Sequence, residues 1–158
     1  MTHTEIRQVL DNLNIRNYTI RPNGVVDVDG CVDISWFSGT SLPVQFGKVT
    51  GKFSAGASPI LSLNGFPYYI GTDLFIHSTN IESLSGIEKI IKEIHGGVYL
   101  DPRTTHILGL LLIPGITGFG IDDRGPIDNI MNKYIGTGDI VSAQDELIDA
   151  GFINHARM

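Results

Sequence analysis

The sequence predicts an α+β protein: a short solenoid of parallel strands with about four coils, an N-terminal helix and C-terminal capping helices. One observation behind this prediction is a pair of apolar residues that recurs about every 21 residues. Another is the content of 19 glycines in 158 residues, which indicates many tight turns because no Pro-rich or Ser-rich tract accompanies them. We expect a single domain, with an N-terminal cap at 1–29, the solenoid at 30–118 and a helical cap at 119–158.

The N-terminal cap is predicted to contain a helix and a hairpin. Thr4 is a suitable cap for a helix over residues 5–13, where apolar residues fall at helical spacing: Ile6, Val9, Leu10 and Leu13. Residues 18–20 and 25–28 are rich in β-formers. They flank the turn sequence Pro22-Asn23-Gly24, which is typical of a hairpin.

Two landmarks with one period predict the solenoid. Each short strand is expected to follow a glycine (Gly30, Gly51, and Gly71 or Thr72) and to point two residues inward. The inward pairs are Val32 and Ile34, Phe53 and Ala55, Leu74 and Ile76, and Val98 and Leu100. Successive pairs are 21, 21 and 24 residues apart, and the second landmark, Leu42, Leu63 and Leu84, keeps steps of 21. This period lies in the range of about 20–29 residues for leucine-rich repeats, so we expect one strand and one turn per coil, stacked into two apolar ladders.

The C-terminal part breaks the period. Residues 87–94 read as a short helix that lengthens the third coil, and the apolar, turn-rich segment from Ile107 onward is expected to cover the open end. Two further helices are predicted at 128–135 and 141–150. For the second of these, the expected caps are Asp139 or Ser142, the expected terminating residue is Gly151, and the expected inward residues are Val141, Leu147 and Ile148.

Composition excludes several classes of function. The net charge of −6, with no basic cluster, disfavours nucleic acid as a ligand because such binding depends on neutralising phosphates. Cys31 is the only cysteine, so neither a disulfide framework nor a thiolate metal site is expected. The longest apolar run, residues 107–113, is too short to span a membrane, and the N-terminus does not read as a signal peptide. We therefore expect a cytoplasmic protein.

Several segments resemble leucine-rich-repeat-like proteins encoded by large tailed bacteriophages. The resemblance lies in VDVDGCVDIS, TSLPVQFGKVTGKFSAG, SLNGFP, IGTDLFIHSTNIESLSG and the tail SAQDELIDAGFINHARM. The sequence departs from the family at Ala57-Ser58 and Ser78-Thr79, where asparagine pairs are usual, and in the longer third coil. The resemblance implies a small accessory protein of infection that acts in the host cytoplasm, and a repeat face that binds another protein.

A candidate binding surface follows from strand alternation, because the residue between two inward residues points outward. This column is predicted to hold Asp33, Ser54, Phe75 and Tyr99, flanked by Trp36, Asp73, His77 and Asp101. Aromatic anchors within a polar rim are typical of protein-binding surfaces. An alternative stays open at this point, in which the C-terminal segment folds back and covers the rings.

Other constellations point to weaker hypotheses. His77-Ser78-Thr79 and Thr105-His106 could place two imidazoles across a phosphate, as in two-histidine phosphodiesterases and related nucleases. The remaining histidines lack metal-ligand spacing, and Asp122-Asp123-Arg124 reads as a solvated turn. No metal or cofactor is expected.

The sequence therefore predicts a non-enzymatic module that binds a host protein, such as a defence factor or a toxin, and inhibits or modulates it. A catalytic role for His77 and His106 is the first alternative, and a structural or self-assembling phage protein is the second. The chain is expected to be a monomer or a small homo-oligomer.

Overall fold

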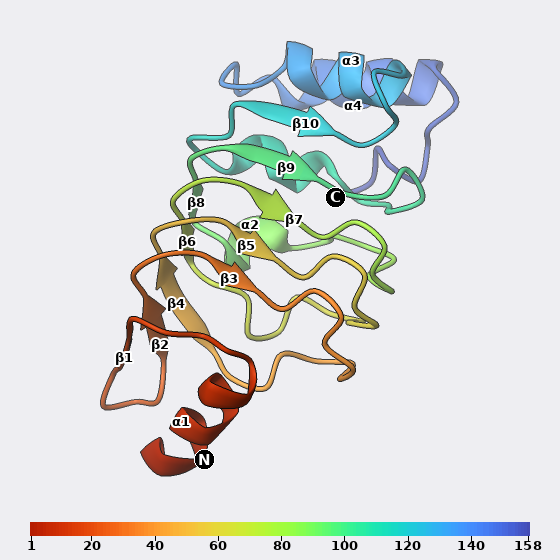
Figure 1. Cartoon of the computed structure of the whole chain (residues 1–158). Coiled ribbons are helices and arrows are strands. Elements are labelled where there is room, and N and C mark those ends of the chain that lie inside the picture. The colour runs from red at the N-terminus through yellow and green to blue at the C-terminus, as the bar shows by residue number, and fades with distance from the viewer.

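A computed structural model describes all 158 residues, and it forms a solenoid of two five-stranded sheets (Figure 1). The front sheet has the order β10-β9-β7-β5-β3 and the side sheet the order β1-β2-β4-β6-β8. The front strands are β3 (Val32–Asp33), β5 (Phe53–Ser54), β7 (Leu74–Phe75), β9 (Gly97–Tyr99) and β10 (Gly118–Gly120). The side strands are β1 (Tyr18–Ile20), β2 (Val26–Val28), β4 (Phe46–Val49), β6 (Tyr69–Ile70) and β8 (Glu93–Ile94).

The predicted ladder forms the centre of the front sheet. Val32 pairs with Phe53, Phe53 with Leu74 and Leu74 with Val98, all in parallel register. Phe119 of β10 adds a fifth rung beside Val98, so the segment after Ile107 does form a further coil. The second ladder is also confirmed, because its members are buried: Ile34, Ala55, Ile76 and Leu100.

The prediction of one strand per coil is wrong. Each of the first four coils contributes a strand to the front sheet and another to the side sheet. Side-sheet pairs such as Val49 with Ile70, and Ile70 with Ile94, are parallel and buried. Between the sheets, Phe53 contacts the rings of Phe46 and Phe66, with centroids 5.4 and 5.2 Å away. The core thus lies between two sheets and the leucine-bearing turns.

Periodic glycines mark the corner where the chain passes from the side sheet to the front sheet. A Cβ atom at Gly51 would lie 2.8 Å from the carbonyl carbon of Gly30, and one at Gly71 would clash with the backbone of Thr50. Neither Gly51 nor Gly71 has a positive φ angle. Close approach of successive coils, and not turn geometry, therefore requires glycine at these two corners.

The N-terminal end is closed by α1 (His3–Asn12) and the antiparallel β1–β2 hairpin. The helix is capped by Thr2, and not by Thr4, because the Thr2 side chain accepts the amide of Glu5 in a capping box. The hairpin is held by Arg21, which donates two hydrogen bonds of 2.8 Å to Asp27. Asp27 also accepts the backbone amide of Lys48, which joins the hairpin to the first coil.

Two short helices pack behind the front sheet. The helix predicted at 87–94 ends early: α2 covers only Ile87–Ile90, and Ile94 joins the side sheet. Pairing with Ile70 outweighs the helical spacing there, since a four-residue helix gains little from local hydrogen bonds. In the next coil, the 3-10 helix η1 (Leu108–Leu112) lies against α2.

The C-terminal end is capped by α3 (Pro126–Lys133) and α4 (Ile140–Asp149), which stack on β10 and η1 (Figure 1). Asp139 caps α4 and Gly151, at φ +92°, follows its end. The predicted inward face is partly wrong: Leu147 is buried, but Val141 and Ile148 are exposed. The helix starts at Ile140, so Ala143 shares the buried stripe with Leu147. No helix is long and apolar enough to cross a membrane.

Candidate functional site

The outer face of the front sheet is left uncovered by the rest of the chain. The C-terminal helices lie on the end of the solenoid, and the tail after Gly151 runs along the loop that follows β9. Asn154 and His155 accept the amides of His106 and Ile107 through their carbonyl oxygens. The alternative in which this segment covers the aromatic rings is therefore wrong.

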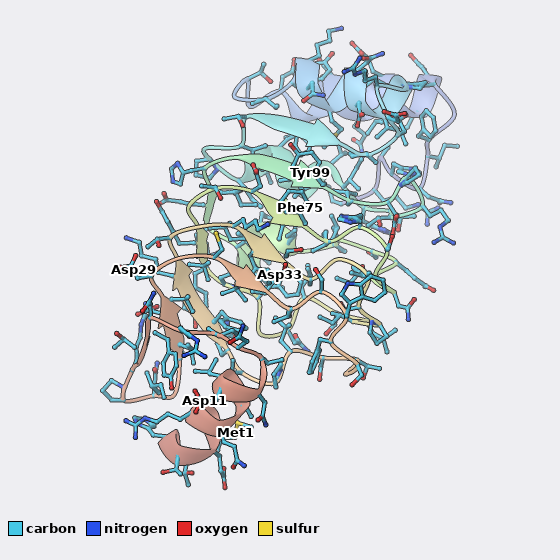
Figure 2. The ribbon with its side chains drawn as sticks, viewed as in Figure 1. Met1, Asp11, Asp29, Asp33, Phe75 and Tyr99 are labelled. Carbon is cyan, nitrogen blue, oxygen red and sulfur yellow. The ribbon has the colours of Figure 1, made fainter.

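Phe75 and Tyr99 form a stacked pair on this face (Figure 2). Strands β7 and β9 place them side by side, with ring centroids 4.7 Å apart and planes at 8°. Tyr99 also extends over Gly120, where a Cβ atom would lie 2.6 Å from its ring. Phe75 is half-buried and Tyr99 keeps 38% of its surface exposed. The pair forms a continuous apolar surface fixed by two hydrogen-bonded strands.

Polar side chains border the aromatic pair. The Lys52 ammonium lies 5.8 Å from the centre of the Phe75 ring, and His77 meets the same ring edge-on at 6.1 Å. His77 is exposed, and its ring lies over Gly56 of the preceding coil. Lys52 was absent from the predicted site. Its position directly before Phe53, beside the outward column, is the signal that could have identified it.

The lower part of the column is polar. Asp33 is exposed, whereas Ser54 is buried at 7% and shares a 3.2 Å hydrogen bond with Ser35. Ser54 is too small to reach the surface between its larger neighbours, so its predicted exposure is wrong. Hydrogen bonds from Ser35, with a smaller contribution from the charge of Lys52, lower the pKa of Asp33. Asp33 is therefore an ionised carboxylate at neutral pH.

The other two predicted carboxylates hold coils together. Asp73 accepts the amide of Gly97 in the next coil at 2.6 Å, and Asp101 accepts the amide of Ser78 in the preceding coil at 2.8 Å. Both are half-buried. Their main role is to fix the spacing of the strands that carry the aromatic pair.

Trp36 lies apart from the pair, just beyond the end of β3. Its side chain is 82% exposed, and its backbone adopts a left-handed conformation at φ +68°. The indole borders a hollow of about 550 Å³, which Asp33 also lines. The front sheet thus presents two separate features, the aromatic pair at its centre and Trp36 at its first strand.

The structure does not bring His77 and His106 together as a catalytic pair would require. His77 follows β7 in register with Asp101, while His106 follows a bridge between Thr105 and Ser83 farther along the coil. His106 bonds the hydroxyl of Thr105 at 2.9 Å and lies beside the tail.

No three His, Cys, Asp or Glu side chains cluster as a metal site would require. Asp122, predicted in a solvated turn, instead accepts the amides of Ile127 and Asp128 and so holds the start of α3. Asp123 and Arg124 of the same turn are exposed.

Comparison with family models, with curated proteins and with solved structures finds no match to this chain.

Proposed function

We propose that this chain is a non-enzymatic binding module whose front face holds another protein. The observation that carries the proposal is the uncovered stack of Phe75 on Tyr99, bordered by Lys52 and His77. Aromatic side chains with a polar rim provide most of the binding energy in many protein interfaces. The parallel strands hold both rings before the partner arrives, so binding loses little side-chain entropy.

The proposed partner is a host protein, such as a defence factor or a toxin, that the chain inhibits or modulates in the host cytoplasm. This part of the proposal rests on the resemblance to repeat proteins of large tailed bacteriophages. The binding surface itself rests on the geometry of the front sheet.

A capture experiment with matched variants tests the proposal. The Phe75→Asp/Tyr99→Asp variant should lose a host protein that the wild-type chain retains from bacterial lysate. The control is Leu61→Asp/Tyr68→Asp, which also replaces two exposed apolar residues, 58% and 38% exposed, but lies away from the front sheet. It should retain the partner. Circular dichroism must show that both variants are folded.

Equal capture by wild type and both double variants would place the interface elsewhere. Equal loss from both double variants would show a general effect of added charge and would remove the support for the front face.

A further inference from the structure

The front sheet has an open edge at its first strand. The amides of Val32 and Ile34 bond the carbonyl oxygens of Lys52 and Ser54 in β5. Because successive amides of a strand point to opposite sides, the amide of Asp33 faces away from β5. No strand lies on that side, since β3 ends the sheet. The other end is closed, because Asn132 of α3 bonds both the amide and the carbonyl of Phe119 in β10.

A hollow of about 550 Å³ runs along this open edge. One wall is β3 with Cys31 and Asp33, and the other is the chain after α1, with Leu13 and Ile15. Leu13 is half-buried and Ile15 is buried, so the floor is apolar. The hollow therefore combines an unpaired strand edge with space beside it, as the addition of an extended strand requires.

Trp36 stands at the mouth of this hollow with two features that the fold does not explain. Its left-handed backbone is unfavourable for a bulky residue, and its indole is 82% exposed. Backbone strain that is retained at an exposed aromatic residue points to a role in binding. A chain lying along β3 would come against the indole.

Charge decides which occupant fits. If two copies of this chain paired through β3, their Asp33 carboxylates would oppose each other, and each copy carries a net charge of −6. Lys52 offers limited relief, because its ammonium lies over Phe75. Arg16 on the far wall bonds Asn14, so a basic residue is favoured only opposite Asp33.

We propose that β3 accepts an extended segment of a partner protein as an added strand, with basic side chains beside Asp33 and apolar side chains toward Leu13 and Ile15. Period-two alternation of the segment meets both demands at once. The proposal rests on the proposed function only in taking a protein as the partner, because the aromatic pair does not line this hollow.

The test uses a synthetic peptide of alternating valine and lysine with blocked ends, added to the isotope-labelled full chain. Backbone amide shifts are expected to be largest between Cys31 and Trp36. An alternating valine–glutamate peptide should bind at least about tenfold more weakly. N-methylation at alternate residues should abolish binding in one phase and spare it in the other, because only one set of amides faces β3.

Variants of the edge supply the controls. Asp33→Asn keeps the amide and should weaken the lysine peptide several-fold. Asp33→Pro removes the open amide while leaving the bonds of Val32 and Ile34 to β5, and should abolish binding. Trp36→Gly should also weaken binding.

The proposal is overturned if the lysine peptide does not bind or if the glutamate peptide binds equally well. It is also overturned if the shifts centre on Phe75 and Tyr99. None of these results touches the capture experiment on the aromatic pair, so the two proposals fail separately.

Discussion

At the scale of single residues, Trp36 is the position where the fold and the exposed surface conflict most. A left-handed backbone costs a residue with a Cβ atom roughly 1–2 kcal/mol. The exposed indole regains little of this through burial, since only 18% of its surface is covered. The sequence predicted an aromatic residue near the column, but backbone conformation could not be read from Ser35-Trp36-Phe37.

Replacing Trp36 with glycine is therefore expected to stabilise the protein. The Trp36→Gly variant should gain up to about 1 kcal/mol in the free energy of unfolding, after the higher entropy of an unfolded glycine is subtracted. Urea unfolding followed by circular dichroism measures this change. Leu61→Gly is the control, because Leu61 is also exposed but has no positive φ angle, and it should lose stability. Clear destabilisation by Trp36→Gly would show that the indole packs in the folded state.

At the scale of elements, Asn132 connects a helix to a sheet edge. Its side chain accepts the amide of Phe119 at 2.8 Å and donates to the carbonyl of the same residue at 3.3 Å. In this way α3 takes the place of a sixth strand. This contact explains how β10 ends the front sheet without exposing unpaired backbone groups.

The Asn132→Ala variant should lose about 1 kcal/mol in the free energy of unfolding, because two hydrogen bonds are removed. Hydrogen exchange at the amide of Phe119 should become faster. Asn132→Asp keeps the acceptor and should protect that amide better than alanine does. The control is Asn129→Ala, an exposed asparagine on the same helix. Unchanged exchange in all three variants would show that the helix does not seal the edge.

Elements were predictable to different degrees. The rungs Val32, Phe53 and Leu74 were predicted because one period places them in register and each is fully buried. The side sheet was missed because strands such as Tyr69–Ile70 and Glu93–Ile94 are two residues long and share no residue pattern. Strands so short depend on neighbouring coils, which local sequence does not describe.

At the scale of the whole molecule, the candidate site was predicted in its direction and not in its contacts. Alternation correctly placed Phe75 and Tyr99 on the outer face. It could not show that Asp73 and Asp101 bond amides 24 and 23 residues away in neighbouring coils. Such bonds depend on the stacking of coils, which only the three-dimensional structure gives.

The same scale governs the response to acid, because ion pairs hold both ends. Hydrogen bonds from Arg21 lower the pKa of Asp27, and hydrogen bonds from Lys133 and then Tyr134 lower the pKa of Glu146. Both pKa values lie below those of the unfolded chain, near 4. These carboxylates therefore stabilise the fold fully above that pH, and the stabilisation is lost as the pH falls through the folded-state pKa.

The Asp27→Asn/Glu146→Gln variant should consequently lose less stability than wild type between about pH 5 and about pH 3. Urea unfolding at the two pH values measures the difference. Asp11→Asn/Asp145→Asn, which changes two exposed carboxylates, should behave like wild type. If both double variants changed the acid response equally, overall charge and not the two ion pairs would be responsible.

The register of the front sheet has a consequence for how such a chain can change in length. Val32, Phe53 and Leu74 follow each other at steps of 21 residues, and each coil bonds only the coils beside it. Duplication of one such segment in the gene would insert a complete coil that continues every rung. Both ends would keep their own contacts, so proteins of this design can grow by whole units without a new core having to evolve.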